Sequence, residues 1–310
     1  MWLSEIMLQQ TRVEAVKGYY TRFLEKLPTI RALAEAEEDT LLKLWEGLGY
    51  YSRVRNLQKA AREIMEQFGG TFPHTKEDIL TLPGIGAYTA GAICSICFEE
   101  PTPAVDGNVL RVLSRYLACG KPVTDEKVKR EAAALLEPVY PKGHCGEFTQ
   151  ALMELGATAC APNGAPDCGA CPLREFCRAR QQGTQMNFPV KQAKKPRRRE
   201  KRTVFILRCG EKLAVCKRPE KGLLAGLWQL PDCPGKLTVQ EALAQASAWG
   251  VRPSGIEKTV NREHIFTHVH WELQGIYLKC AREDTFTWVT TEELEQKIGL
   301  PTAYRQFLSE

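Results

Sequence analysis

The sequence predicts two domains of different class: a mainly α N-terminal domain over residues 1–182 and an α+β C-terminal domain over 203–310. Most of the first part has apolar residues at the three- and four-residue spacing of amphipathic helices. After residue 202, short apolar or alternating runs bounded by turn residues are typical of strands. A basic linker over 183–202 lies between the two parts, and 310 residues suffice for two separate cores.

The composition fits an intracellular protein. Hydrophobic residues make up 44% of the chain, yet no apolar run is long enough to span a bilayer. The first residues do not have the basic-then-apolar pattern of a secretory signal. Twelve cysteines in such a chain favour reduced thiols and metal binding over a disulfide framework.

The net charge of +5 is unevenly distributed along the chain. The twelve residues from Lys191 to Arg202 carry +7, so the remainder of the chain sums to −2. The basic excess is therefore a property of the linker. It fits a contact with nucleic acid or another polyanion and, equally, a solvated connection between domains.

The chain enters helical periodicity at once, and we expect one helix from Met1 to about Leu27, ended by Pro28. Glu5 lies among apolar neighbours in this helix, where a carboxyl group would have a raised pKa and could act as a general acid. The plain alternative is a glutamate that interacts favourably with the helix dipole. Further helices are expected at about 30–35, 38–47, 52–68 and 75–81.

The segment Leu82–Arg115 organises the helical domain. It opens with Leu-Pro-Gly-Ile-Gly, a turn in which Gly84 and Gly86 can take positive φ, and a helix follows from Ala87. A Gly-x-Gly turn that opens a helix presents backbone N–H groups to a phosphate, although more often it is only a turn. Twenty residues after Gly86, Asp106 has the position of an N-cap for a further helix.

Two other segments of the helical domain carry residue types with possible chemistry. Gly47–Arg53, reading GLGYYSR, is a loop whose tyrosines either stack against bases or pack in the core. A helix over Phe148–Cys160 leads into the pattern Cys160-x7-Cys168-x2-Cys171-x5-Cys177. Four cysteines in so short a loop suit one S4 site, for which zinc and a [4Fe–4S] cluster compete evenly.

The C-terminal domain begins with an expected β-hairpin, Thr203–Arg208 and Lys212–Lys217, turned at Cys209-Gly210-Glu211. A helix is expected over Leu237–Trp249. Further strands are expected at about 258–260, 265–269, 272–278 and 285–289, with a last helix at about 291–297.

The Gly-x-Gly turn, followed at this spacing by Asp106, resembles the helix–hairpin–helix–Gly/Pro–Asp superfamily of base-excision DNA glycosylases. The segment SEIMLQQT at residues 4–11 resembles the catalytic helix of one branch of this superfamily, the adenine DNA glycosylases or MutY family. The resemblance implies that Glu5 is the catalytic acid, which protonates N7 of adenine. It implies that Asp106 stabilises the oxocarbenium-like sugar or bonds to it transiently, while Tyr88 and Asn108 shape that step. Lyase relatives such as endonuclease III have a lysine in place of Tyr88, so we expect a monofunctional enzyme.

The same resemblance assigns binding residues. The positions expected to contact DNA around the mispair or at its phosphates are Gln10, Leu48, Tyr50, Arg53, Gly84 and Gly86. Gln150 matches a position that hydrogen-bonds the extruded adenine. The family holds a [4Fe–4S] cluster through four cysteines, and the matching residues here are Cys160, Cys168, Cys171 and Cys177. The first gap between these cysteines is one residue longer in this sequence than in the family.

The C-terminal domain resembles a Nudix fold, particularly through the segment GLWQLP at Gly226–Pro231. Its expected helix lacks the glutamate cluster that would hold Mg²⁺, so we expect a binding module without pyrophosphatase activity. In the MutY family this domain reads 8-oxoguanine with a Phe-Ser-His loop. The matching residues are Phe266, Thr267 and His268, in which threonine keeps the hydroxyl and adds a methyl group.

The resemblance therefore implies a monomeric glycosylase that removes adenine opposite 8-oxoguanine or guanine in double-stranded DNA, located in a bacterial cytoplasm at the nucleoid and not on a membrane. Relatives usually carry a further segment before the SEIMLQQT helix, which packs beside the adenine pocket, whereas this sequence begins at Met1. The alternative is therefore a catalytically silent protein that binds DNA lesions. A zinc-stabilised nucleic-acid scaffold is a third possibility.

Overall fold

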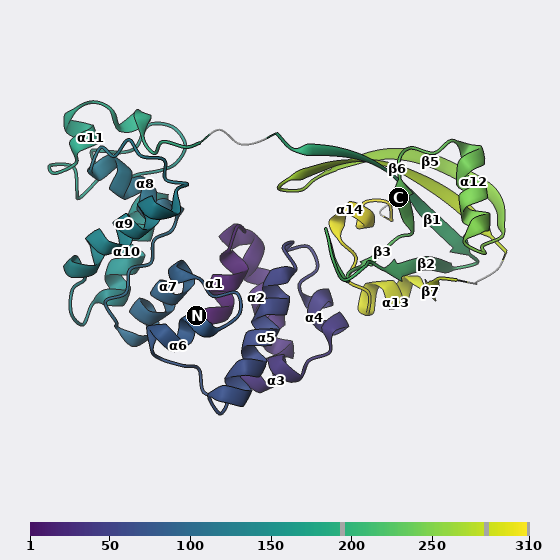
Figure 1. Ribbon diagram of the computed structural model, residues 1–310, viewed down its shortest axis with the longest axis horizontal. Helices are drawn as coiled ribbons and strands as arrows, with labels where there is room; N and C mark the ends of the chain where they lie inside the picture. Colours follow the sequence, from purple (N-terminus) through teal and green to yellow (C-terminus); the bar gives the residue numbers. More distant parts are fainter. Residues whose placement is uncertain (193–195, 282–284, 309–310) are drawn as a thin grey trace. The chain divides into compact units, whose positions relative to one another are not determined.

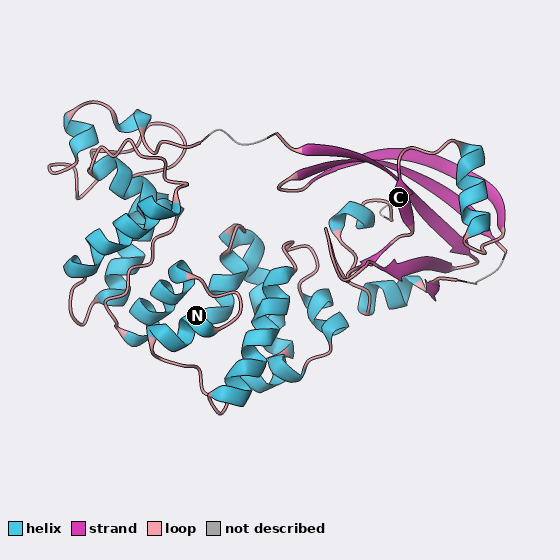
Figure 2. Ribbon diagram, viewed as in Figure 1, coloured by secondary structure: helices cyan, strands magenta, loops and turns pink. Residues whose placement is uncertain are grey.

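The computed structural model describes residues 1–192, 196–281 and 285–308, so Lys194 and Lys195 of the basic tract lie outside the described residues. Contacts divide the chain into two compact units that do not follow chain order. The first unit comprises Met1–Val16, Thr29–Ala34 and Asn56–Lys194, and the second comprises Lys17–Pro28, Glu35–Arg55 and Lys195–Glu310. Strands occur only after residue 197 among the described residues (Figure 2), as the two expected fold classes require.

The first unit is helical, as predicted. Its helices are α1 (Trp2–Leu8), α3 (Ile30–Glu35, in this unit to Ala34), α5 (Ser52–Gln67, in this unit from Asn56), α6 (Lys76–Thr81), α7 (Ala87–Phe98), α8 (Gly107–Tyr116), α9 (Glu126–Leu136), α10 (Cys145–Ala157) and α11 (Arg178–Gln181), with 3₁₀ turns at Glu137–Val139 and Gln185–Asn187. One core cluster joins Ile64, Ile79, Leu82 and Ile93 from α5, α6, the turn after it and α7. The expected helix to Cys160 ends earlier, at Ala157.

The prediction of a single helix from Met1 to Leu27 is wrong. Helix α1 ends at Leu8, and α2 (Val13–Lys26) begins after a turn. Gln10 has a left-handed backbone with φ of 58°, which no α-helix accommodates, and the N–H of Thr11 returns to the carbonyl of Leu8 at 3.2 Å. Apolar periodicity continues across this turn, so the pattern alone could not locate it.

The turn between α6 and α7 has the expected glycine chemistry at one of its two positions. Gly84 has φ of +81°, and a Cβ atom there would lie 2.8 Å from Cβ of Asn56, so both backbone and space require glycine. Gly86 instead has an extended backbone, with φ of −104°, and is the N-cap of α7. Because glycine has no side chain, the first amides of α7 receive no side-chain cap from it.

The second unit is built on a mixed sheet with strand order β3-β2-β1-β6-β5, to which β4 adds at β1 and β7 at β2. Strands β1 and β6 are parallel, and the other pairs are antiparallel. The elements are α2 (Val13–Lys26, in this unit from Lys17), α4 (Glu38–Leu44), β1 (Arg198–Cys209), β2 (Lys212–Lys217), β3 (Trp228–Gln229), β4 (Asp232–Pro234), α12 (Val239–Ala248), β5 (Pro253–Ile265), β6 (Val269–Cys280), β7 (Thr287–Val289), α13 (Thr291–Gln296) and α14 (Thr302–Arg305).

Both faces of this sheet are buried, which explains the continuous apolar run in β1. Val204 and Ile206 pack in one core cluster with residues of α14, whereas Phe205 and Leu207 pack in another with α12. Successive side chains of a strand point to opposite faces, so each core takes alternate residues. Figure 1 shows α12 lying across the sheet.

The expected β1–β2 hairpin and the α12 helix are confirmed. A single strand predicted at 265–269 is wrong, because Ile265 ends β5, Val269 begins β6, and the three residues between them form the turn. The residues Arg198–Arg202, expected in a linker, form the start of β1 and pair with β6. Pairing with a neighbouring strand thus orders a segment whose charge alone suggested a solvated connection.

Helix α4 belongs to the second unit through specific side-chain contacts. The ammonium of Lys43 donates to the carbonyls of Leu294 and Ile298 at 3.2 and 3.0 Å. A carboxylate oxygen of Glu46 accepts the N–H of Leu300 at 3.0 Å and also pairs with Arg305. These contacts fix the loop that follows α4 within the same compact unit as the sheet.

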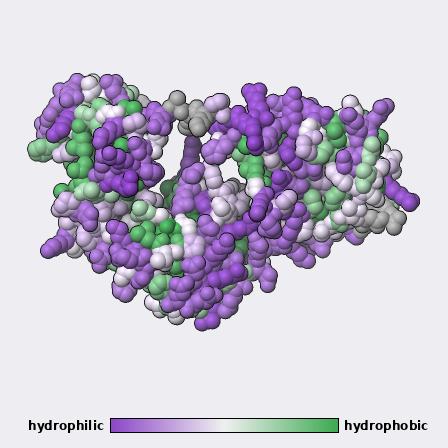
Figure 3. All heavy atoms as spheres, viewed as in Figure 1, coloured by the Kyte–Doolittle hydropathy of each residue, from purple (hydrophilic) through white to green (hydrophobic). Residues whose placement is uncertain are grey.

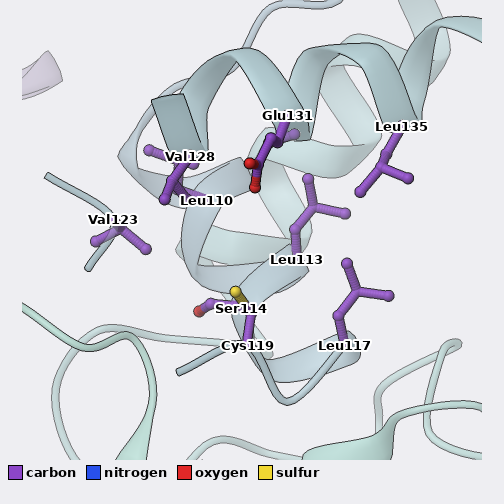
Figure 4. Close-up of a pocket in the computed structure, with 10 residues that line it drawn as sticks. Leu110, Leu113, Ser114, Leu117, Cys119, Val123, Val128, Glu131 and Leu135 are labelled. Carbon is purple, nitrogen blue, oxygen red and sulfur yellow. The ribbon is translucent and has the colours of Figure 1, made fainter. Parts of the chain in front are cut away.

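Helices α8 and α9 enclose a small apolar pocket of about 50 Å³ in the first unit. Figure 4 shows Leu113 and Leu117 beside it, with Glu131 among the lining residues. None of the residues predicted to be catalytic or to contact DNA lines this pocket.

Among the described residues, no helix has both the length and the apolar character needed to cross a membrane. The face drawn in Figure 3 is covered mostly by hydrophilic residues, with smaller apolar areas between them.

Candidate active site and nucleic-acid interface

Helices α1 and α7 bring Glu5 and Tyr88 together in the first unit. The phenol of Tyr88 donates a hydrogen bond to Oε2 of Glu5 at 2.8 Å. Glu5 is 9% exposed, with Ile6 and Met7 buried beside it on α1. One helical turn further, the amide of Gln9 donates to the hydroxyl of Thr89 at 3.3 Å, so two contacts hold α1 against the start of α7.

This environment keeps a proton on Glu5 to higher pH than in water. Burial raises the pKa of Glu5, the hydrogen bond from Tyr88 opposes the rise, and the nearby charge of Asp106 adds to it. Burial also raises the pKa of Tyr88, with the charge of Glu5 second, so the phenol remains a donor. The arrangement provides a carboxylic acid poised to give up a proton.

Asp106 is the N-cap of α8, as the sequence predicts. Its Oδ1 accepts the N–H of Val109 at 2.7 Å, and its Oδ2 accepts the side-chain amide of Asn108 at 2.8 Å. These two donors fix the orientation of the carboxyl group at the start of α8. The charge of Asp106 acts on Glu5, so the two carboxyl groups lie within electrostatic range of each other.

A chain of hydrogen bonds connects this site to the cysteine loop. Arg111 donates to Oδ1 of Asn108 at 2.8 Å, to the carbonyl of Gly156 at 2.6 Å and to the carbonyl of Cys160 at 2.8 Å. A Cβ atom on Gly156 would lie 2.6 Å from Cβ of Asn108, so α10 packs directly on the start of α8. Arg111 is 7% exposed and therefore acts inside the unit.

The four cysteines of the loop lie near one another. Burial raises the pKa of Cys168, and the neighbouring thiols of Cys177, Cys171 and Cys160 raise it further. Arg115 donates to both the sulfur and the carbonyl of Cys160 at 3.2 Å. The described residues contain no group of three or more side chains arranged to hold a single metal ion. Four neighbouring thiols are the ligand type that an iron–sulfur cluster requires.

The loop Gly47–Arg53 lies in the second unit. Tyr50 is 45% exposed and has a left-handed backbone with φ of 48°. Leu48 and Arg53 are buried, and the Arg53 guanidinium donates to the carbonyls of Leu48 and Gly49 at 3.2 Å. The charged end of Arg53 supports the loop from inside, and its predicted phosphate contact stays a prediction. Burial lowers the pKa of Arg53 to about 10.

The β5–β6 turn presents the Phe-Thr-His tripeptide in the same unit. Phe266 packs edge-on against His264 and Trp271, with ring centroids 4.5 and 4.9 Å apart. Thr267 and His268 are exposed. The hydroxyls of Tyr50 and Thr267 are 2.9 Å apart and share a hydrogen bond. The structure thus joins two residues that were assigned separately to lesion contact.

Two family models match the chain. The model of the HhH-GPD superfamily of base excision DNA repair proteins matches residues 3–138, and the model of the NUDIX domain matches residues 203–310. The second match begins within β1, the first strand among the described residues.

Curated relatives cover both parts together. The adenine DNA glycosylase of Homo sapiens is 36% identical over 94% of this chain, and that of Schizosaccharomyces pombe is 35% identical over 94%. The chain covers 76% of the yeast relative, and 89% of an adenine DNA glycosylase of Buchnera aphidicola at 31% identity. This chain belongs to the adenine DNA glycosylase family. It spans 64% of the length of the human relative.

Solved structures support the fold of the helical part. A thermostable thymine-DNA glycosylase aligns with a TM-score of 0.52 at 27% identity, over 58% of this chain and 83% of its own. Endonuclease III in a non-covalent complex with DNA aligns equally well, with 25% identity over 59% of this chain and 84% of its own. The helix-hairpin-helix glycosylase fold of the N-terminal part is thereby established.

In this adenine DNA glycosylase family member, some predicted site residues are not joined to the carboxylates. Gln150 is exposed on α10, and the described contacts do not connect it to Glu5 or Asp106. Gln10 is exposed in the turn after α1. Their assigned contacts with adenine and DNA stay predictions.

Sequence reasoning missed Arg111 and Arg115, whose guanidinium groups tie α8 to the cysteine loop. The two arginines are spaced four residues apart on one face of α8, which was a usable signal. Both are buried, at 7% and 4% exposure, and such a pair in an otherwise apolar helix face indicates internal partners.

We expect no Nudix-type active site in the C-terminal part, because the helix that is α12 in the structure lacks a cluster of glutamates. Glu241 is its only glutamate, and its carboxylate accepts the N–H of Thr238 at 2.8 Å in a capping box. This carboxylate is therefore committed to the end of the helix.

Proposed function

We propose that this chain removes adenine from double-stranded DNA where adenine is mispaired with 8-oxoguanine or guanine. The observation that carries the proposal is the buried, hydrogen-bonded Glu5 whose pKa is raised, beside the capped carboxylate of Asp106. A pair of carboxyl groups held in different protonation states is the general solution for cleaving a glycosidic bond. Adenine reaches such a site by being flipped out of the duplex.

In this mechanism Glu5 supplies the proton. Because Tyr88 donates to Oε2, the acid proton of Glu5 resides on Oε1 and is directed to N7 of adenine. Protonation makes neutral adenine the leaving group when the bond between N9 and the sugar C1′ breaks. Two electrons of that bond leave with the base, and an oxocarbenium-like sugar remains.

Asp106 then acts on the positive sugar. Its carboxylate, oriented by Val109 and Asn108, stabilises this charge or bonds to C1′ transiently, and water completes the hydrolysis. The products are free adenine and an abasic site in an intact strand. Tyr88 offers no amine for a Schiff base, which supports base removal without strand cleavage.

The Phe266–His268 turn supports recognition of 8-oxoguanine. Phe266 is anchored in the core, so the exposed Thr267 hydroxyl and His268 ring are presented as hydrogen-bonding groups. Tyr50, bonded to Thr267, is the exposed aromatic that can enter the base stack.

Cys160, Cys168, Cys171 and Cys177 would hold a [4Fe–4S] cluster, which would pin the loop that contains them. Arg111 and Arg115, which donate to the carbonyl of Cys160, would then hold α8 in a fixed position relative to this loop.

The direct test is single-turnover release of adenine from a duplex containing one adenine:8-oxoguanine pair, and from one containing adenine:guanine. We expect release from both duplexes without strand cleavage. Selective binding of the 8-oxoguanine duplex without release would instead identify a silent lesion-binding protein. The absence of both release and selective binding would contradict the proposal.

The hydrogen bond between Tyr88 and Glu5 predicts a change in pH dependence. Tyr88→Phe removes the hydrogen bond that lowers the pKa of Glu5, so this pKa should rise further. Glu5 would then keep its proton to higher pH, and the pH at which adenine release declines should increase. The measurement is the single-turnover rate constant across roughly four pH units around neutrality. Tyr116→Phe on α8 is the matched control, and an unshifted profile for Tyr88→Phe would show that the hydrogen bond does not tune Glu5.

A further inference from the structure

The basic tract and the Phe266–His268 turn form one structural piece. Figure 1 shows the start of β1 running beside the β5–β6 turn within the C-terminal sheet. The guanidinium of Arg197 donates to the carbonyl of Phe266 at 3.1 Å, and the N–H of Arg198 donates to the carbonyl of His268 at 3.1 Å. Arg198 is also the strand partner of Val269 in β6. The cations therefore have a fixed position at the turn.

The charged ends of these arginines remain accessible. The side chains of Arg198 and Arg199 are 73% and 74% exposed. Arg198 pairs with Glu200 at 2.5 Å, and Arg199 lies 3.8 Å from Glu272. Ion pairs at exposed side chains are weak. Each arginine can therefore bind a phosphate in place of its carboxylate partner or in addition to it.

Arg202, in the same tract, has a different role. Its side chain is only 16% exposed and donates to Asp232 at 2.7 Å, and its guanidinium lies 5.0 Å from the centre of the Trp271 ring. It belongs to the core, which separates the structural end of the tract from the exposed end.

We propose that Arg197, Arg198 and Arg199 bind phosphates of the DNA strand whose base is read by the Phe266–His268 turn. The inference rests on the proposed function, because it takes lesion-containing duplex DNA as the partner. An element that reaches a base edge must pass the phosphates beside it, and arginines bind phosphates through charge-assisted hydrogen bonds. Arg197 has a second task, since its bond to Phe266 also holds the reading turn in place.

The test measures the affinity for an adenine:8-oxoguanine duplex as salt concentration is varied. It is made in a Glu5→Gln background, so that bound adenine stays attached. The triple change Arg197→Gln, Arg198→Gln and Arg199→Gln should weaken binding at low salt by roughly 10- to 100-fold. It should also reduce the slope of log affinity against log salt by about 0.9 for each phosphate that is no longer neutralised, or about 2 to 3 in total.

A matched control removes three cations from the opposite end of the same sheet. Arg208 lies near the end of β1, Arg252 precedes β5 and Lys279 lies near the end of β6, where it is the strand partner of Arg208. Changing all three to glutamine gives the same net charge as the test variant, and we expect affinity and salt slope to remain unchanged. The triple Arg→Lys variant of the tract should keep the slope, because lysine retains the charge.

Single variants separate the two tasks. Arg198→Gln should weaken binding to 8-oxoguanine and guanine duplexes by the same factor. Arg197→Gln should also lower the ratio between the two affinities, by about 3- to 10-fold, since it removes one hydrogen bond that holds the turn.

Three results would overturn the inference: an unchanged salt slope in the glutamine triple variant, an equal loss of affinity in the control triple, or a reduced slope in the lysine triple variant. Thermal melting of each variant shows that a loss of affinity is not a loss of fold. Failure of the proposed function has a different signature. In that case the unmodified chain releases no adenine, and the Glu5→Gln chain does not prefer the lesion duplex.

Discussion

Glu5→Gln should reduce the single-turnover rate of adenine release by roughly 10²–10⁴-fold while leaving lesion binding intact. Glutamine has the size of glutamate and can still accept the hydrogen bond that Tyr88 donates at 2.8 Å. It cannot give a proton to adenine. The reduction should be largest at low pH, where the unmodified chain has Glu5 fully protonated, and smaller as pH rises through the raised pKa of Glu5.

A suitable control is Glu14→Gln, which removes a carboxyl group from the first turn of α2. It should leave the rate unchanged. If Glu5→Gln releases adenine at the unmodified rate across the pH range, another group must supply the proton, and the role assigned to Glu5 is wrong.

The same substitution should stabilise the fold, which distinguishes a catalytic residue from a structural one. The folded chain has a raised pKa for Glu5, whereas the unfolded chain has an ordinary one. Below the ordinary pKa both states are protonated and no penalty exists. As pH rises from the ordinary pKa through the raised one, the unfolded chain ionises before the folded chain, and stability is lost until the penalty is complete above the raised pKa. Glu5→Gln removes this penalty, so it should increase the melting temperature by a few degrees at neutral pH and less at pH 4.

The elements of the fold that the sequence predicted were those with a local cause. Asp106 precedes a glycine and an apolar helix, and a cap needs no more than that short context. The apolar run of β1 likewise predicted a strand, and the structure shows that both of its faces are covered. The end of α1 could not be found, because the left-handed residue Gln10 interrupts a helix without interrupting its apolar pattern.

The errors in the C-terminal part have a non-local cause. β5, with the sequence PSGIEKTVNREHI, has few apolar residues, and it is ordered by its long antiparallel pairing with β6. Ile265, Phe266 and Val269 are apolar and lie at or beside the turn, so the segment 265–269 has the composition of a strand. Judged by composition over a few residues, the turn segment therefore looked more like a strand than most of β5, which precedes it.

Site residues could be predicted from the sequence where a motif identifies the residue. Contacts that depend on the distance between residues far apart in the sequence could not be predicted. Glu5, Tyr88 and Asp106 were assigned through motifs, and only folding brings the first two within 2.8 Å. The burial of Arg53 could not be read from a loop of glycines and tyrosines, which suggested the surface. Similarly, the carbonyl of Cys160 as a partner of Arg111 depends on the packing of α10 against α8.

Asp106→Asn should reduce adenine release by roughly 10²–10³-fold, because the carboxylate that stabilises the sugar cation is removed. The fold should be nearly unaffected, since asparagine caps helices about as well as aspartate and can accept the N–H of Val109. The new amide would face the amide of Asn108, which now donates to Asp106 at 2.8 Å. Asp106→Ser avoids two opposed donors, because serine has one small hydroxyl and is also a good cap.

Asp106→Ala completes this series, since it removes both charge and cap and should cost about 1 kcal/mol of stability. Release rates and melting temperatures for the three variants then separate the two roles. Loss of release in all three, with a lower melting temperature only for alanine, would assign the charge to catalysis and the oxygen to the cap. Release by the serine and asparagine variants at the unmodified rate would mean that Asp106 only begins α8. In that case the sugar cation would need another partner, and the two-carboxylate mechanism would fail even if Glu5 is essential.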